Sequence, residues 1–126
     1  MFELDGNKLL RELEGKKLMR AFDMGGAYPY TTMLKSQIHG FNNSWAVLWH
    51  ASAFLRGVLT LYPGQSLVQN IGFDKSGTHT GSTNYFSGPL SDRPIRVASI
   101  AVAESAEALR AFKHVFFSWR LRLFSM

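Results

Sequence analysis

The sequence contains no cysteine, which excludes disulfide bonds, thiolate metal sites and a cysteine nucleophile. It also lacks a Walker loop, a G-x-G-x-x-G pattern, a G-x-S-x-G elbow and an H-E-x-x-H helix, so the common signatures of nucleotide, ester and zinc-protease chemistry are missing. Apolar runs long enough to span a bilayer are absent, and residues 1–5 have neither the basic region nor the apolar core of a signal peptide. We therefore expect a cytoplasmic protein, at most peripheral to a membrane.

Acidic residues are fewer than basic ones: 9 Asp and Glu stand against 14 Lys and Arg, a net charge of +5. Such an excess is compatible with nucleic acid, anionic lipid, phosphorylated sugar donors, or simple solubility. The basic residues are spread along the chain, with a local excess only near the end, and no Lys/Arg run of the nucleic-acid-binding type occurs. We favour solubility and expect no nucleic-acid partner.

The length of 126 residues fits one domain. Apolar spacing, glycines and cap residues predict helices first, then a short β portion and a long loop, and finally a helix to the end. This order predicts an α+β fold in a single domain over residues 1–126. The expected helices cover about 6–22, 29–40, 45–56 and 105–126, the expected strands 58–62, 67–73 and 95–101, and the loop about 74–94.

Two stretches have side chains suited to binding. In the first, glycines would let the backbone approach a ligand, and amide, carboxylate, hydroxyl and imidazole groups would contact it. Its candidates are Asn70, Gly72, Asp74, Ser76, Thr78 and His79. In the second, Trp45 and Trp49 lie one helical turn apart and would form a flat apolar wall against which a sugar ring could stack. The residues alone leave plainer alternatives open, since His79 could be an ordinary surface residue and both indoles could pack in the core.

Together these stretches resemble a known family. The run Asn42–Leu55 reads NNSWAVLWHASAFL and is similar to the block D-S-W-A-I-R-W-Y-A-S-x-F-L of bacterial family 2 glycosyltransferases with the GT-A fold. The next run, Leu59–Gly72, reads LTLYPGQSLVQNIG and matches the segment that follows in the family. Asp74–His79 matches its D-x-S-G-T-H ending, and Phe22–Asp23 with Ala27–Tyr30 resembles the block upstream. The resemblance covers about residues 22–80.

The resemblance implies the acceptor-side, carboxy-terminal half of such an enzyme. In the family, a Rossmann-like amino-terminal half binds the nucleotide-sugar, and an Asp-x-Asp motif holds Mn²⁺ or Mg²⁺ on the diphosphate. No Asp-x-Asp occurs in this sequence. By resemblance His79 is the candidate metal ligand, and the other residues of the two stretches are candidates for substrate binding.

This sequence departs from the family at two positions. The family's acidic residue before Ser-Trp is Asn43, which cannot accept a proton from a sugar hydroxyl at neutral pH. Asn43 is left to orient a hydroxyl or to cap the helix. Leu48 replaces an arginine between the two tryptophans and removes a polar contact.

We therefore expect sugar transfer from a nucleotide-sugar to a carbohydrate or other hydroxyl acceptor in the intact parent, and no activity from this chain alone. A non-catalytic binding module that self-associates as a homo-oligomer is the alternative. The terminal helix, with its aromatic and basic residues, is expected either to dock on the domain or to make weak contact with a membrane surface.

Overall fold

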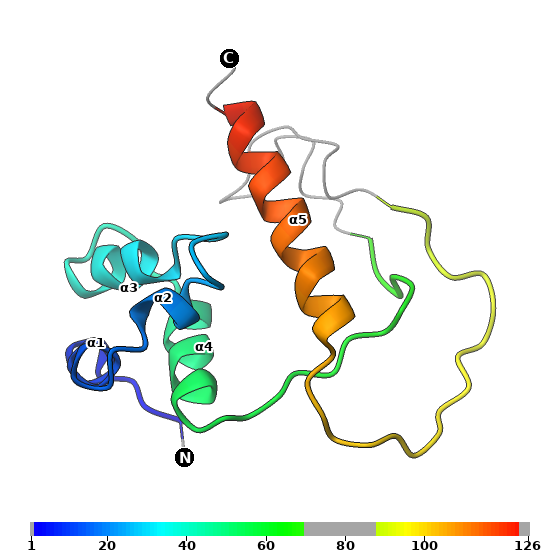
Figure 1. Cartoon of the computed structure of the whole chain (residues 1–126), viewed down its shortest axis with the longest axis horizontal. Helices are drawn as coiled ribbons and strands as arrows, with labels where there is room; N and C mark the ends of the chain where they lie inside the picture. The colour runs from blue at the N-terminus through cyan, green and yellow to red at the C-terminus, as the bar shows by residue number, and fades with distance from the viewer. Residues whose placement is uncertain (1, 70–87, 124–126) are drawn as a thin grey trace. The chain divides into compact units, whose positions relative to one another are not determined.

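The computed structural model describes residues 2–69 and 88–123, with 119–123 described by their backbone alone. It divides into two compact units, Met1–Leu59 with Val102–Met126, and Thr60–Ala101. The described part is mostly helical. Four helices lie in the first stretch of chain and one near its end (Figure 1).

The first unit begins with four short helices, and polar or proline residues mark the start of α1, α3 and α4. α1 (Gly6–Gly15) is capped by Asp5, whose side chain accepts a hydrogen bond from the backbone of Lys8 at 3.1 Å. α2 (Met19–Phe22) is a single turn. α3 (Tyr30–Ile38) follows Pro29, and the Asp23 carboxylate accepts a 2.6 Å hydrogen bond from the backbone N–H of Thr31 in its first turn. α4 (Trp45–Leu55) starts at Ser44 and completes the group.

The prediction of one helix over residues 6–22 is wrong, because the chain turns between α1 and α2. Lys17 adopts a left-handed backbone conformation with φ 56°. The backbone N–H of Leu18 donates to the carbonyl of Leu13 at 2.9 Å, and that of Lys17 donates to Glu14 at 3.0 Å. This pair of bonds is a Schellman motif, which satisfies the last carbonyls of the helix and ends it.

The next three helices end in the same way. Their left-handed residues are Met24 after α2, Gly40 after α3 and Gly57 after α4, with φ of 54°, 76° and 64°. Each is followed by the matching pair of backbone hydrogen bonds. The predicted stops at Gly40 and Gly57 are thus confirmed, since glycine adopts this conformation without the steric cost of a Cβ atom.

The core lies among α1 to α4. Seven buried apolar residues form one cluster, and Leu13, Phe22, Leu34 and Ala51 have no exposed surface. α1 contributes at successive turns, as the apolar spacing predicted, and α4 contributes three residues from one face. The full cluster is Leu9, Leu13, Phe22, Leu34, Val47, Leu48 and Ala51.

A glycine marks the closest approach between α1 and its neighbours. Gly6 is buried, and a Cβ atom placed on it would lie 2.8 Å from Ile38 Cγ1, 3.1 Å from Gln37 Oε1 and 3.3 Å from Leu48 Cδ2. Ordinary carbon contacts are about 3.5–4.0 Å. The start of α1 therefore packs against α3 and α4 at a distance that only glycine permits.

The second unit, Thr60–Ala101, does not form the predicted β portion within its described residues. The segments 58–62 and 95–101 have no regular secondary structure and belong to no ladder, and 67–69 is irregular. The β pairing described there is one isolated parallel bridge between Ser66 and Leu90. The strand predictions for 58–62 and 95–101 are wrong. These segments contain β-branched residues, which favour strands, but a strand also needs a pairing partner that its own sequence does not specify. The α+β prediction is corrected to a mostly helical fold, and residues 70–87 of the predicted strand and loop lie outside the described range.

The last helix, α5 (Ala106–Leu123), begins where the sequence predicted. Ser105 caps it, because its Oγ accepts a hydrogen bond from the backbone N–H of Ala108 at 3.1 Å. On one side the ring of Phe116 contacts Tyr28 with centroids 4.7 Å apart. Neither α5 nor any other helix in the described ranges combines the length and apolarity that crossing a bilayer requires.

Candidate functional site

The turn that leads into α4 is held by three polar contacts. The side-chain amide of Asn42 donates to the carbonyl of Met33 at 3.2 Å, which ties the turn to α3. Its Oδ1 accepts from the backbone of Ser44 at 3.0 Å. Ser44 Oγ in turn accepts from the backbone of Val47 at 3.4 Å and caps α4, which begins at Trp45 as the sequence predicted. The direction and rotation of the first turn of α4 are therefore fixed.

The two tryptophans of this helix lie outside the core. Trp45 retains 70% and Trp49 44% of its surface exposed, whereas Val47, Leu48 and Ala51 of the same helix are buried. The alternative that both indoles pack in the core is thus wrong. Because they are four residues apart, the rings occupy neighbouring turns on one side of α4. The result is an exposed apolar wall on a rigidly positioned helix.

Asn43 lies immediately before this wall. Its side chain is exposed and makes no hydrogen bond to another residue within the described ranges. Capping of α4 is performed by Ser44, so the capping role left open for Asn43 belongs to its neighbour. A free amide offers two donors and an acceptor to a ligand beside Trp45.

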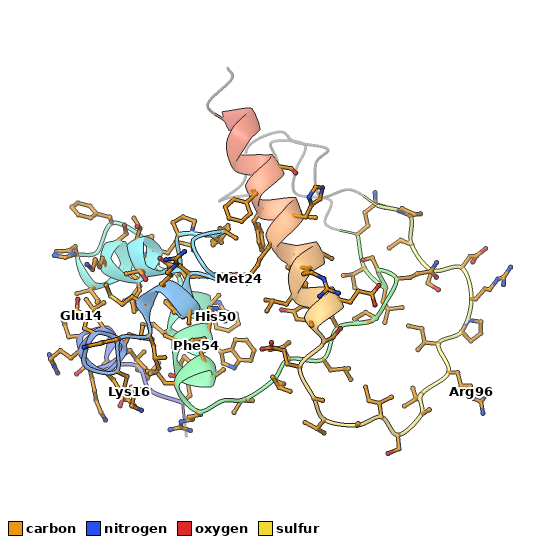
Figure 2. The ribbon with its side chains drawn as sticks, in the orientation of Figure 1. Glu14, Lys16, Met24, His50, Phe54 and Arg96 are labelled. Atoms are coloured by element: carbon orange, nitrogen blue, oxygen red, sulfur yellow. The ribbon has the colours of Figure 1, made fainter. Side chains whose placement is uncertain are left out.

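His50 occupies a different environment on α4. Its ring stacks on Phe22 with centroids 5.1 Å apart and meets Tyr30 at 4.3 Å. Figure 2 shows His50 and Phe54, which follow each other by one helical turn; Phe54 also contacts Phe22, at 5.5 Å. Burial among these rings lowers the pKa of His50, because the charged form loses hydration.

The Nε2 atom of His50 is buried without a hydrogen-bond partner among the described residues. Such a group is costly to bury, by about 1–3 kcal/mol. From the sequence alone, His50 was assigned no role. Its position one residue after Trp49 in an apolar helix was the available signal, but α4 is apolar on all sides and its sequence does not reveal which face is buried.

A small cavity of about 240 Å³ lies at the other end of α4, between the amino-terminal segment, α1 and α4. Its charged lining residues include Glu3, Lys8 and Arg56. Glu3 Oε2 and Lys8 Nζ form an ion pair at 2.6 Å, which lowers the pKa of Glu3 and raises that of Lys8. The backbone of Glu3 is fixed by Ser52, whose Oγ accepts from its N–H at 3.1 Å and donates to its carbonyl at 3.2 Å. Glu3, Lys8 and Ser52 thus satisfy one another, and the cavity lies where the amino-terminal segment attaches to α1 and α4.

The glycine-rich candidates all lie outside the described residues. They are Asn70, Gly72, Asp74, Ser76, Thr78 and the metal-ligand candidate His79. Their roles in substrate and metal binding therefore stay predictions. Within residues 2–69 and 88–123, no three His, Asp or Glu side chains come together in a way that could hold a metal ion.

Comparison with protein-family models, curated proteins and solved structures found no match. Function is therefore inferred from the chain's own residues. Among the described ones, the wall formed by Trp45 and Trp49, with Asn43 beside it, is the arrangement best suited to contact a ligand.

Proposed function

We propose that this chain is the acceptor-side portion of a nucleotide-sugar-dependent glycosyltransferase, and that Trp45 and Trp49 bind the acceptor sugar. The supporting observation is the exposure of both indoles on neighbouring turns of α4. A pyranose ring has a face of C–H groups and an edge of hydroxyls. The face suits an indole surface, and the edge needs hydrogen-bonding groups such as the amide of Asn43.

In the intact parent, an acceptor hydroxyl would attack the anomeric carbon of the donor sugar and displace the nucleoside diphosphate. Within this chain, the indoles would hold the acceptor ring and Asn43 would orient its hydroxyl. Asn43 cannot remove the proton, so a carboxylate elsewhere in the parent must serve as base. Mn²⁺ or Mg²⁺, when bound in the parent, would neutralise charge on the leaving diphosphate.

The described residues contain no group of three His, Asp or Glu side chains that could hold a metal ion, so none of them is given a role in metal binding. His79 is retained as the proposed ligand from the family resemblance alone. Without the donor-binding half and a base, we expect the isolated chain not to transfer sugar. The test is release of nucleotide from UDP- and GDP-sugars with Mn²⁺, and turnover well above that of a His79→Ala variant would overturn the expectation.

Acceptor binding is tested separately, by saturation-transfer NMR with methyl glycosides of glucose, galactose and mannose. Saturation should reach the C–H face of at least one sugar in the native chain. Trp45→Ala and Trp49→Ala should each weaken the signal, by roughly fivefold in affinity for a stacking contact of about 1 kcal/mol. Phe41→Ala is the matched control, because Phe41 is 84% exposed in the preceding turn but lies off α4. Equal loss in all three variants, or none, would remove the role of the indoles.

A second candidate function is a non-catalytic module that self-associates. The exposure of large apolar residues in the first unit favours it, since such surface is usually covered in use. Light scattering over a range of concentrations tests this candidate. A monomer at every concentration would exclude it, whereas an oligomer dissociated by Trp45→Ala without any sugar signal would favour it over sugar binding.

A further inference from the structure

α5 has two sides of different character. On one side, Phe112 and Phe116 stack with centroids 6.3 Å apart, and Phe116 contacts Tyr28 of the same unit. Phe117 is the next residue and lies about 100° further around the helix, since 3.6 residues complete a turn. It retains 47% of its surface exposed. The side of α5 that carries Phe117 therefore differs from the side that contacts Tyr28.

Basic residues share the side of α5 that carries Phe117. Arg110 and His114 precede Phe117 by seven and three residues, and both are exposed. Lys113 precedes it by four residues and lies at the border, with its Nζ near Gly25. Positions three, four and seven apart lie on one side of a helix. An exposed aromatic ring thus lies beside the positive charges of Arg110 and Lys113 and the imidazole of His114.

Acidic residues within α5 are confined to its first turn. Glu107, in the first turn of α5, is the last acidic residue of the sequence, and residues 108–126 contain none. The same stretch contains four of the chain's 14 Lys and Arg residues. They are Arg110, Lys113, Arg120 and Arg122. The stretch of sequence that follows Glu107 therefore has a positive formal charge.

We propose that α5 lies on an anionic lipid surface, with Phe117 inserted among the acyl chains and Arg110 and His114 facing the headgroups. Helices that lie in a membrane interface combine basic residues with Phe, Trp or Leu in this way. Each Lys or Arg near an anionic surface contributes an attraction that corresponds to about fivefold in affinity. Lipid is favoured over nucleic acid because the basic residues are few and spaced along a helix, with no Lys/Arg run. This binding does not depend on the proposed sugar transfer.

The test is flotation of the full chain with vesicles of phosphatidylcholine alone and with equimolar phosphatidylglycerol. The chain should float with the anionic vesicles, remain behind with the neutral ones, and bind less tightly as salt is raised. Phe117→Ser should lower the affinity about fivefold or more, and Arg110→Glu at least fivefold. The controls are Phe41→Ser and Lys35→Glu, which remove an exposed aromatic and an exposed charge elsewhere in the first unit and should leave flotation unchanged. Far-ultraviolet circular dichroism of each variant confirms that its helices are intact.

Several outcomes would overturn the proposal. The first is absence of flotation with anionic vesicles, and the second is equal flotation with neutral ones. Loss of binding to the same degree in the controls and in the α5 variants would show that net charge or general apolarity is responsible. Tight binding of a single-stranded RNA oligonucleotide, without vesicle binding, would assign the same face to nucleic acid.

Discussion

Two glycines at opposite ends of α1 should respond to the same substitution with opposite signs. Gly6→Ala places a methyl group 2.8 Å from Ile38 Cγ1, so that neighbouring atoms must move by about 0.7 Å to reach ordinary contact. Overpacking of this kind costs about 1–3 kcal/mol, offset by at most about 1 kcal/mol of helix propensity. Gly15→Ala meets no atom within 4 Å and should gain about 0.5–1 kcal/mol from propensity alone.

The assay is urea denaturation of both variants and the native chain, followed by circular dichroism. With a slope of about 1–3 kcal/mol/M, the two midpoints should separate by about 1 M, with Gly6→Ala below the native chain and Gly15→Ala above it. Gly6→Ala combined with Ile38→Ala should cost less than the sum of the two single substitutions, because the clash is with that side chain. If Gly6→Ala stabilises as much as Gly15→Ala, then α1 does not pack against Ile38 as described.

Three further predictions concern single residues. Lys17→Gly should stabilise the chain by about 1 kcal/mol, because a left-handed backbone is strained for a residue with a Cβ; an unchanged urea midpoint would contradict this. Ser52→Ala should destabilise it by about 1–3 kcal/mol, measured by the same denaturation, since both backbone groups of Glu3 lose their buried partner. Because folding lowers the pKa of His50, the unfolded chain binds more protons, so stability should be fully present above about pH 6.5 and fall as the pH drops below it. In thermal melts at several pH values, His50→Leu should reduce the decrease in melting temperature at low pH, whereas replacing the exposed His39 should not.

The sequence predicted those features that depend on local chemistry. The predicted helix starts near residues 45 and 105 are confirmed, where the hydroxyls of Ser44 and Ser105 accept backbone hydrogen bonds. Gly57 ends a helix because it tolerates a positive φ. The turn at Lys17 was missed because a lysine adopts this conformation only where the surrounding packing compensates for the strain. The predicted strand at 58–62 failed because pairing is non-local and its partner cannot be read from the segment itself.

The candidate site was less predictable than the helix that supports it. Spacing correctly placed Trp45 and Trp49 on one side of α4, but it could not tell whether that side faces the core. The helix is apolar all round, so its sequence contains no contrast between an inner and an outer face. The structure shows that the two tryptophans are exposed because α1 and α3 pack against the opposite side of α4, through Leu9, Leu13 and Leu34.

That exposure constrains what can cover the two indoles. Full burial of a large apolar side chain stabilises a protein by about 1.5–3 kcal/mol. Because Trp45 and Trp49 are exposed, the chain does not obtain this full stabilisation at either position. A partner protein would recover it, but it would also have to satisfy the free amide of Asn43 at the edge of the wall. A sugar ring meets both requirements at once, because its C–H face contacts indole and its hydroxyls hydrogen-bond an amide. The Asn42 and Ser44 contacts fix the wall before any ligand arrives, and a preformed surface lowers the entropy cost of binding a small molecule.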